Sequence, residues 1–487
     1  MSDDRMSRQE EGREAAGAHK ANNAENAEEA RDVAGSVSCP AIVIAAPASG
    51  QGKTTATAAL ARLHARQGRR VRVFKCGPDF LDPHWHQLAS GAPVHQLDLW
   101  MTGAADCARR LYEAAQDADL LLIEGVMGLF DGESSVADLA MRFGIPVLAV
   151  VDASAMGGTL GAIVHGLRHY RPGLPWAGVL ANRVATERHA SLLRAGLTDA
   201  ADWLGALPRV TLAAENGPRL LPERHLGLVA AHELHDALQR LDAAADALAA
   251  TPLGQMTVAD WQRWRVAFAA PASTVEDAAA TPALLAGRTV AVGGDAAFCF
   301  VYDANLQTLE QLGARVVRFS PLHDAALPPC DAAWLPGGYP ELHAEALAAN
   351  TGMQQSLRAH IAAGRAVWAE CGGMMALFES ITLQDGRRLP LWGLLPGDVT
   401  MQRRLAALGP QQLDVGGQVL RGHTFHYSTC ESTAAVIART MRPGAAEGAP
   451  PGEALYRHGS VHASYFHAWF ASNPRATALL LGAGDAP

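Results

Sequence analysis

The sequence is short of charged residues and lacks long apolar runs. Only 18% of its 487 residues are charged, although 49% are hydrophobic. No uninterrupted apolar run reaches the roughly 18 residues that suggest a membrane-spanning helix. The formal net charge is −9, and lysine and arginine form no dense stripe of the kind that nucleic-acid binding requires. We therefore expect a soluble globular protein that engages neither membrane nor nucleic acid.

Paired cysteines are also missing. The seven cysteines are an odd number at irregular spacing, so they indicate neither a disulfide framework nor a set of metal ligands. This pattern fits a protein of the reducing cytoplasm. The chain is long enough for two or three domains, each with its own core.

Composition divides the chain into four parts. Residues 1–39 are polar, charged and alanine-rich, without the apolar stretch of a secretory signal, so we expect a disordered tail. Residues 241–286 are typical of an alanine-rich helix followed by a linker rich in Pro, Ala, Ser and Thr. They separate a domain at 40–240 from another at 287–487, and in both domains buried-looking strands alternate with helical stretches. This alternation predicts α/β domains with parallel sheets and crossover helices.

A phosphate-binding loop follows the first strand of the N-terminal half. The strand "AIVIAAP" leads into "ASGQGKTT" and then into an amphipathic helix. In such a loop backbone N–H groups cradle phosphates, a lysine reaches the outer phosphates and a hydroxyl binds Mg²⁺. The loop is a variant, because Pro47 stands where the usual pattern has its first glycine. The residues expected to bind ATP are Gly50, Gly52, Lys53, Thr54 and Thr55, with Thr54 also a Mg²⁺ ligand.

Polar side chains end three further strands of this half. Glu124 closes the strand of "LLIEG", at the edge where ligands bind in open α/β sheets, and can hold Mg²⁺ directly or through water. The stretch "VFKCGPDFLDPHWH" brings Lys75, Asp79 and Asp82 to the same edge, where Asp79 or Asp82 can complete the Mg²⁺ shell or position an acidic substrate. For each carboxylate the alternative is a plain turn residue. The strand "GVLANRV" ends at Asn182, a position suited to reading adenine.

A lone cysteine, Cys371, stands between a strand and a helix in the C-terminal half. "RAVWAEC" is typical of a short buried strand and "GGMMALFES" resumes with helical spacing, which predicts a sharp strand-to-helix turn at Cys371. Such a turn pushes the side chain out of the sheet, and the N–H groups of the next helix favour a thiolate and a developing oxyanion. Free cysteine is also a common filler of protein cores. Cys371 is thus either a nucleophile or a buried small side chain.

A nucleophilic cysteine needs a base, and several histidines follow it. "HGSVHASYFHAWF" contains His462 and His467; His467 follows a strand-like segment and is favoured, with His462 as the second choice. The stretch "AAWLPGGYPE" ends a strand at Gly337 and Gly338, whose flexible backbone can aim an N–H at a tetrahedral intermediate. A thiol, a histidine and a glycine turn together suit attack on an amide.

Seven motifs, in this order, resemble the cobyrinic acid a,c-diamide synthase family, also called the hydrogenobyrinic acid a,c-diamide synthase family. They are "PASGQGKTT", "KCGPDFLDP", "EGVMGLFDG", "LPERHLGL", "LPGGYPE", "ECGGMM" and "RGHTFHYS", and the resemblance runs from about residue 40 to the C-terminus. It implies a P-loop domain like that of dethiobiotin synthetase, joined to a class I, triad-type glutamine amidotransferase domain. It also implies a carbon–nitrogen ligase that uses ATP, Mg²⁺ and glutamine to amidate the a and c acetates of a corrin during vitamin B12 synthesis.

The resemblance also assigns roles to particular residues. It implies that Cys371 is the nucleophile, that His467 activates it, and that the N–H groups of Gly338 and Gly372 hold the oxyanion. Many triad amidotransferases have a glutamate two positions after the histidine, where this sequence has Trp469. The third triad member is therefore absent or comes from elsewhere in the chain.

Several side chains are candidates for holding the carboxylates of the corrin. "PGDVTMQRRLAALG" offers Arg403 and Arg404, "LPERHLGL" offers Arg224 and His225, and Asp82 can help to position the substrate. The alternative for each arginine is a solvated surface position. The corrin is either cobyrinic or hydrogenobyrinic acid, which differ in cobalt, and the sequence leaves a homodimer open.

Three other functions fit parts of the sequence. The nearest is a related amidoligase of the same architecture, such as cobyric acid synthase or an enzyme acting on a nickel tetrapyrrole. The first half also resembles partitioning-type ATPases, which switch between dimeric states and have no need of Cys371. A stand-alone glutaminase or cysteine hydrolase would leave the P-loop unexplained. The motifs "RGHTFHYS" and "LPERHLGL" favour the diamide synthase.

Overall fold

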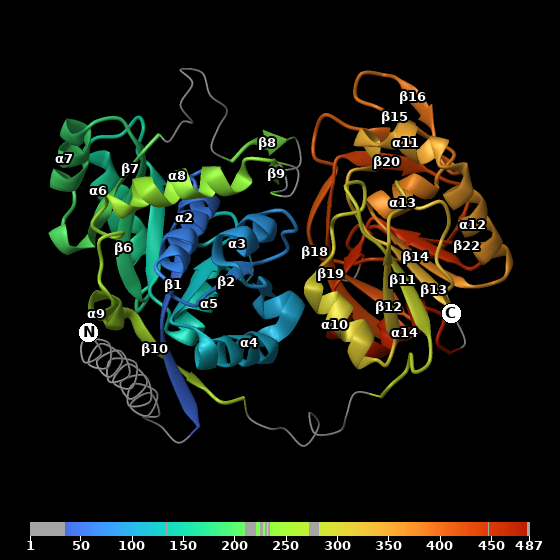
Figure 1. Cartoon of the computed structure of the whole chain (residues 1–487), viewed down its shortest axis with the longest axis horizontal. Helices are drawn as coiled ribbons and strands as arrows, with labels where there is room; N and C mark the ends of the chain where they lie inside the picture. Colours follow the sequence, from blue (N-terminus) through green and yellow to red (C-terminus); the bar gives the residue numbers. More distant parts are fainter. Residues whose placement is uncertain are drawn as a thin grey trace, which may run out of the picture.

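The computed structural model shows two α/β domains side by side (Figure 1). It describes residues 35–132, 134–209, 221–224, 227–228, 231, 234–271, 282–446 and 448–484. The predicted fold class, two domains built on parallel sheets, is confirmed. None of the helices within these ranges is long and apolar enough to cross a membrane.

The N-terminal domain is a doubly wound sheet. Its strands are β1 (Ser36–Ala45), β2 (Val71–Cys76), β3 (His95–Leu97), β4 (Leu120–Glu124), β5 (Val147–Asp152), β6 (Trp176–Val184), β7 (Trp203–Pro208) and β10 (Arg265–Ala269). The parallel order is β3-β2-β4-β1-β5-β6-β7, and β10 pairs antiparallel with the start of β1. A separate short hairpin joins β8 (Glu223–Arg224) to β9 (Gly227–Leu228).

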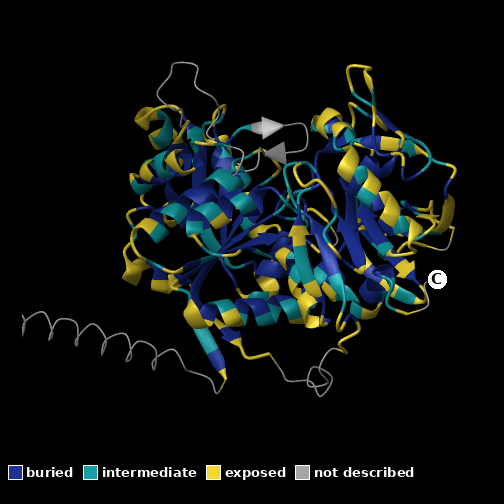
Figure 2. Ribbon diagram, turned by 45° about the vertical axis from the view of Figure 1, so that its right-hand side comes forward, coloured by how far each residue is buried: buried dark blue, intermediate teal, exposed yellow. Residues whose placement is uncertain are grey.

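Helices cover both faces of this sheet. They are α2 (Lys53–Arg66), α3 (Asp82–Ser90), α4 (Ala104–Asp117), α5 (Val136–Phe143), α6 (Thr159–His169), α7 (Glu187–Ala195), α8 (Ala237–Ala249) and α9 (Val258–Trp261). Because side chains alternate along a strand, Ile42 and Ile44 of β1 pack with α2, α3 and α8, while Val43 and Ala45 pack with α4, α5 and α6. The central strands are buried on both faces (Figure 2), which explains their continuous apolar runs.

The C-terminal domain has a seven-stranded main sheet in the order β12-β11-β13-β14-β23-β22-β21. Strands β11 (Thr289–Gly293), β12 (Arg315–Phe319), β13 (Ala332–Leu335), β14 (Ala366–Glu370) and β23 (Val461–Ser464) are parallel; β21 (Ala435–Arg439) and β22 (Ala454–His458) are antiparallel additions. Its helices are α10 (Asp303–Gln311), α11 (Ala344–Ala349), α12 (Thr351–Ala362), α13 (Gly372–Leu377) and α14 (Pro474–Leu480).

Two small sheets complete the C-terminal domain. One contains β15 (Ser380–Thr382), β16 (Arg388–Pro390), β17 (Asp398–Met401) and β20 (Ser428–Glu431). The other contains the long hairpin β18 (Ala407–Val415) and β19 (Gln418–His426), to which β24 (His467–Ala468) adds an antiparallel strand. Figure 1 places this hairpin on the side of the domain that faces the N-terminal domain.

Two of the predicted segment boundaries differ from the structure. The tail was expected to run through residue 39, but β1 begins at Ser36 and pairs with β10; residues 1–34 lie outside the described residues. The segment 241–286, expected to separate the domains, belongs to the N-terminal domain through residue 269, because α8 packs on α2 and β10 extends the sheet. Local composition did not reveal these contacts, because each joins residues far apart in the sequence.

The packing of α6 against the following segment gives a test of this fold. A Cβ on Gly161 would lie 1.8 Å from the carbonyl oxygen of Gly196, whereas a Cβ on the exposed Gly166, one and a half turns later in α6, would meet nothing within 4 Å. We expect Gly161→Ala to lower the free energy of unfolding by about 1–3 kcal/mol through overpacking. Gly166→Ala should raise it by roughly 0.5–1 kcal/mol through helix propensity. Urea unfolding of the two variants measures both effects, and equal effects would contradict this packing.

Candidate active site

The P-loop lies between β1 and α2 and is held in its turn by backbone geometry. Gly50 and Gly52 have φ values of 77° and 98°, in the left-handed region that favours glycine. A Cβ on Gly52 would lie 2.1 Å from Nδ2 of Asn182, and that amide donates to the carbonyl oxygen of Gln51 at 2.8 Å. Asn182 therefore braces the loop, a contact that the sequence prediction of an adenine-reading residue did not include.

Lys53, at the start of α2, is poised over the loop. Its Nζ donates to the carbonyl oxygens of Ala48 at 3.1 Å and Met127 at 2.6 Å. Burial, assisted by the nearby charge of Lys75, lowers the pKa of Lys53 to about 8. Among the described residues the hydrogen bonds of this buried cation go to carbonyl oxygens, which leaves it a ready partner for the phosphates of a nucleotide.

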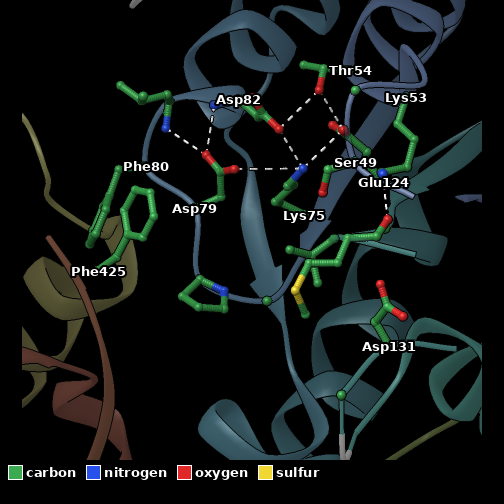
Figure 3. A pocket seen from close by; sticks show the side chains of 18 of the residues that line it. Ser49, Lys53, Thr54, Lys75, Asp79, Phe80, Asp82, Glu124, Asp131 and Phe425 are labelled. Carbon is green, nitrogen blue, oxygen red and sulfur yellow. Dashed lines mark hydrogen bonds and ion pairs between the residues drawn. The ribbon is translucent and has the colours of Figure 1, made fainter. Parts of the chain in front are cut away.

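Four polar side chains meet at the carboxyl ends of β2 and β4 (Figure 3). The hydroxyl of Thr54 donates to Oε1 of Glu124 at 2.7 Å and to Oδ2 of Asp82 at 3.1 Å. The ammonium of Lys75 lies 2.5 Å from the same oxygen of Asp82 and 3.0 Å from Oε1 of Glu124. His86 contacts the other oxygen of Glu124. The sequence prediction that Lys75, Asp82 and Glu124 share one sheet edge agrees with these contacts.

The charges in this cluster are balanced by one another. Burial alone would raise the pKa of Glu124, but the charges of Lys75 and His86 lower it to about 2. Burial likewise disfavours the charged form of Lys75, yet Asp82, Glu124 and Asp79 raise its pKa above the ordinary value. Asp79 lies further out: its Oδ2 is 3.9 Å from Lys75 and its Oδ1 accepts the backbone N–H groups of Leu81 and Asp82. Burial and the charge of Asp82 raise the pKa of Asp79.

This donor set fits a magnesium ion. Mg²⁺ prefers hard oxygen ligands and is usually bound by one or two carboxylates together with nucleotide phosphates. The Thr54 hydroxyl and the oxygens of Asp82 and Glu124 converge within hydrogen-bond distance beside the P-loop. Of the two aspartates, Asp82 lies closer to Thr54, while one oxygen of Asp79 already caps the backbone.

Cys371 occupies a strained turn between β14 and α13. Its φ of 45° and ψ of −108° are unusual for a residue other than glycine, and its N–H donates to the carbonyl oxygen of Ser464 at 2.7 Å. This is the strand-to-helix turn expected from the sequence. Burial, with the charges of Glu341, Glu453 and Glu370, raises the pKa of Cys371, while the N–H of Gly372 opposes the shift. The thiol therefore needs a base before it can attack.

Glycines from two turns close on each other beside Cys371. A Cβ on Gly372 would lie 2.8 Å from the backbone nitrogen of Gly338, and a Cβ on Gly338 would lie 2.1 Å from the carbonyl oxygen of Ala297. The N–H of Gly338 donates no hydrogen bond within the described residues. A buried, unpaired N–H opposite the turn of Cys371 is what an oxyanion hole requires.

His467, on β24, lies against the same glycine turn. A Cβ on Gly337 would lie 2.5 Å from Cε1 of His467, and Nδ1 of His467 has no partner among the described residues. Burial, with the nearby His423 and His426, lowers the pKa of His467 well below its usual range, so the ring is neutral and able to accept a proton. The structure describes no hydrogen bond between His467 and Cys371. His462, the second choice, lies in β23 opposite Trp368, away from this turn.

A histidine–carboxylate pair, His426 and Glu453, was not recognised from the sequence. Nε2 of His426 lies 3.0 Å from Oε1 of Glu453, and Nδ1 lies 2.8 Å from the carbonyl oxygen of Ser428. Both ring nitrogens of His426 therefore have a partner among the described residues. Its ring stacks on Tyr465 at 3.7 Å. Glu453 lies close enough for its charge to affect the thiol. His467 stays the predicted base, because its Nδ1 has no partner among the described residues.

Glu370, directly before Cys371, connects the two strands that carry the thiol and the histidine. Its Oε1 accepts from Nε1 of Trp368 at 2.7 Å and from the N–H of Ala468 at 3.2 Å. It thereby fixes the residue next to His467 without contacting the ring. Trp469, at the position of the usual triad glutamate, is buried beside Tyr302. No carboxylate hydrogen-bonds to His467 within the described ranges.

One cavity of about 1050 Å³ joins the two halves. Its lining includes the expected ATP-binding residues Gly50, Gly52, Lys53, Thr54, Thr55 and Asn182, and the carboxylates Asp79, Asp82, Glu124 and Asp131. From the C-terminal domain it includes His467, His423 and Phe425. Asp131, which accepts from the N–H of Gly128 at 2.7 Å, was missed from the sequence although it lies in the quoted motif "EGVMGLFDG".

Two of the three predicted substrate arginines lie away from this cavity. Arg403 and Arg404 are exposed between β17 and β18 and do not line it. Arg224 lies in β8, where only the backbone is described, and His225 lies outside the described residues. Arg183 and Arg209 line the cavity instead. Whether Arg224, Arg403 or Arg404 contacts a substrate stays a prediction.

A P-loop domain that shares a cavity with a thiol–histidine domain defines the class of glutamine-dependent amidoligases. Comparison with known protein families agrees: residues 42–220 match the CobQ/CobB/MinD/ParA nucleotide binding domain, and residues 289–475 match the CobB/CobQ-like glutamine amidotransferase domain. Each domain therefore matches a family model of its own, and the presence of both in one chain is consistent with a glutamine-dependent amidoligase.

Relatives match almost the whole chain. It is 54% identical over 446 residues to hydrogenobyrinate a,c-diamide synthase of Stutzerimonas stutzeri, covering 92% of this chain and 99% of that protein. The same enzyme of Pseudomonas aeruginosa is 53% identical, covering 91% and 97%. Cobyrinate a,c-diamide synthase of Herminiimonas arsenicoxydans is 48% identical, covering 90% and 96%. The chain belongs to the cobyrinate/hydrogenobyrinate a,c-diamide synthase family.

The buried Glu370 predicts a pH dependence of stability. Burial raises its pKa from the ordinary 4.5 to about 8, against the hydrogen bonds from Trp368 and Ala468. Between these values the folded state keeps a proton that the unfolded chain releases, so this contribution to stability is present below pH 4.5 and is lost as the pH rises to about 8. Glu370→Gln keeps the acceptor oxygen and cannot ionise. We expect urea unfolding to show Glu370→Gln gaining on the wild type by up to about 1.4 kcal/mol per pH unit across this window.

A surface glutamate provides the control for this measurement. Glu345 has an exposed side chain that lies 3.3 Å from Arg387. Glu345→Gln should differ from the wild type by the same small amount at every pH. A pH-independent difference for Glu370→Gln as well would show that Glu370 is ionised in the folded protein, contrary to this account.

Proposed function

We propose that Cys371 and the P-loop catalyse two halves of one reaction, with the corrin bound in the cavity between them. The chain is a glutamine-dependent ligase of cobalamin biosynthesis, and its reaction is the a,c-diamidation of cobyrinate or hydrogenobyrinate. The observation that carries the assignment of the sites is that the P-loop and His467 line the same cavity. A shared chamber lets nitrogen released at one end react at the other.

Glutamine hydrolysis begins at Cys371. His467 takes the thiol proton as the sulfur attacks the side-chain amide carbon, and the oxyanion that forms is held by the N–H groups of Gly338 and Gly372. His467 returns the proton to the leaving nitrogen, the C–N bond breaks, and ammonia and a thioester result. Water then loses a proton to His467 and attacks the thioester; the C–S bond breaks, glutamate leaves and the thiol regains its proton.

The corrin carboxylate is activated at the P-loop. An oxygen of the carboxylate attacks the γ-phosphorus of ATP, the bond to ADP breaks and an acyl phosphate forms. Ammonia attacks its carbonyl carbon, the bond to phosphate breaks, and the surplus proton of the nitrogen leaves with the phosphate. Lys53 neutralises the phosphoryl oxygens. Thr54, Asp82 and Glu124, with Asp79 nearby, would hold Mg²⁺, which would supply further charge neutralisation there.

The cavity suits a large, partly apolar polycarboxylate. Its volume of about 1050 Å³ is at the upper end for small-molecule sites, which run to roughly 1,000 Å³. Trp100, Phe425 and Leu408 offer apolar surface for the face of a macrocycle, and Arg183 and Arg209 offer cations for its carboxylates. Cationic groups from the N-terminal domain would draw the reacting carboxylate towards the nucleotide.

Separating the nitrogen donors tests the two halves independently. With Cys371→Ala we expect glutamine-dependent amidation of the corrin to fall by at least roughly a thousandfold, whereas amidation driven by ammonium chloride stays within about twofold of the wild type. Product formation is measured by chromatography of the corrin. Equal use of glutamine by variant and wild type would make Cys371 a core residue.

Glu124→Gln is the complementary variant. It removes a carboxylate from the Thr54 and Lys75 contacts without changing the size of the side chain. We expect it to lose amidation with either nitrogen donor, while basal glutamine hydrolysis in the absence of ATP persists. Loss of basal hydrolysis in this variant would mean that the two sites are not separable.

A further inference from the structure

Phe80, a residue of the N-terminal domain, packs against the aromatic rings that surround His467 in the C-terminal domain. It lies in the loop between β2 and α3, directly after Asp79 and two residues before Asp82. Its ring stacks on Phe300 at 5.0 Å and 7° and on Tyr302 at 4.2 Å and 26°. It also lies 5.2 Å from the ring of His467 and 5.6 Å from that of His423. All four partners belong to the amidotransferase domain.

The loop that holds Phe80 is tied closely to the carboxylate cluster. Oδ1 of Asp79 accepts the N–H groups of Leu81 at 2.9 Å and Asp82 at 3.0 Å, so the backbone on both sides of Phe80 is fixed to one carboxylate. Asp82 in turn contacts Lys75 and Thr54. Any shift of Asp79 or Asp82 on binding of nucleotide and metal therefore passes to Phe80 with no flexible segment between.

His467 depends on ring packing for its position. Nδ1 has no hydrogen-bond partner in the described part of the chain. The ring is parallel to that of His423, at 4.9 Å and 11°, and His423 is fixed by the hydroxyl of Tyr302 at 2.9 Å. Phe80 touches all three of these rings. Displacing Phe80 thus removes part of the ring packing that holds the base.

Phe80 also lines the cavity that contains the synthetase site. Phe80 and His467 line the cavity together with Gly52 and Lys53, whereas Cys371 does not line it. Figure 3 shows Phe80 beside Phe425 at one side of the pocket, across from Lys53.

We propose that Phe80 is a positioning residue that couples glutamine hydrolysis to the occupied synthetase site, by seating His467 when the loop of Asp79 and Asp82 closes on its ligands. This inference rests on the function proposed above. It makes glutamine hydrolysis faster when ATP, Mg²⁺ and corrin are bound, and it keeps the ammonia formed close to the ammonia used. A residue that merely joined the domains would affect both half-reactions without changing their ratio.

The experiment measures two ratios on the full chain. The first is the rate of glutamine hydrolysis with Mg²⁺, ATP and corrin divided by the rate with none of them; the second is glutamine hydrolysed per amide formed. In Phe80→Ala we expect the first ratio to fall towards one, by about fivefold or more, which is the size of a typical coupling between two sites. We expect the second ratio to rise by a similar factor. Amidation driven by ammonium chloride should persist.

Two further variants make the result specific. Phe80→Tyr keeps the ring and should keep both ratios. Arg421→Ala removes another contact between the domains, in which Nη1 donates to the carbonyl oxygen of Trp100 at 2.8 Å and the guanidinium lies 5.8 Å from the Trp100 ring. It should also keep both ratios, because the Arg421 side chain does not touch His467. Thermal unfolding shows whether each variant is folded. If Phe80→Ala does not fold, Phe80→Leu replaces it, and we expect the same changes in both ratios.

Each contrary outcome has a distinct meaning. Wild-type ratios in Phe80→Ala overturn the coupling role, as does a wild type whose glutamine hydrolysis ignores ATP and corrin. Equal loss in Arg421→Ala also overturns it, because any interface contact would then suffice. Failure of the wild type to form amide from glutamine would instead refute the proposed function itself.

Discussion

The ammonium of Lys75, enclosed by carboxylates, is the interaction on which the synthetase site depends. Burying Glu124 at the end of β4 beside Asp82 at the start of α3 would be costly without a cation, and removing one partner of such a group leaves uncompensated charge. Lys75 holds both carboxylates ionised beside Thr54, in the form that can bind a metal. Because Asp82 also begins α3, the same ion pair fixes the loop that carries Asp79 and Phe80. One buried cation thus positions the nucleotide site and its contact with the other domain.

The amidotransferase site also lies at the carboxyl ends of parallel strands, but its reacting side chains are neutral where those of the synthetase site are charged. Cys371 and the glycines that face it stand at the carboxyl ends of β14 and β13, as Glu124 and Lys75 stand at the ends of β4 and β2. Around the thiol, burial disfavours charge, so the sulfur and the imidazole of His467 are both neutral at rest. His467 lines the same cavity as the P-loop, so the cavity extends from the synthetase site to the predicted base of the amidotransferase site.

Features governed by local pattern could be predicted from the sequence. The apolar runs of β1 and β14, the glycines of the P-loop and the positive φ of Cys371 all follow from nearby residues, and the meeting of Lys75 with Asp82 and Glu124 follows from the rule for carboxyl ends. Contacts between distant segments could not be predicted in this way. Phe80 reaches His467 only because the two domains dock, and β10 joins β1 across more than 200 residues.

The surroundings of other candidate residues also depend on the path of the chain. Arg403 and Arg404 have the chemistry for carboxylate binding, but the path of the chain between β17 and β18 leaves them exposed. The pair of His426 and Glu453 was missed because its members lie on β19 and in the loop before β22, with no spacing that relates them. Only the three-dimensional arrangement shows that the charge of Glu453 acts on Cys371.

The central claim is that both sites act through one sheltered cavity, and the fate of the amide nitrogen tests it most directly. The wild type would be supplied with glutamine that carries heavy nitrogen in its side-chain amide. Unlabelled ammonium would be present in excess over the glutamine, but below the concentration that saturates the synthetase site. Mass spectrometry of the corrin diamide should then find the heavy label in both new amides with little dilution. A product labelled only in proportion to the ammonia free in solution would contradict the account.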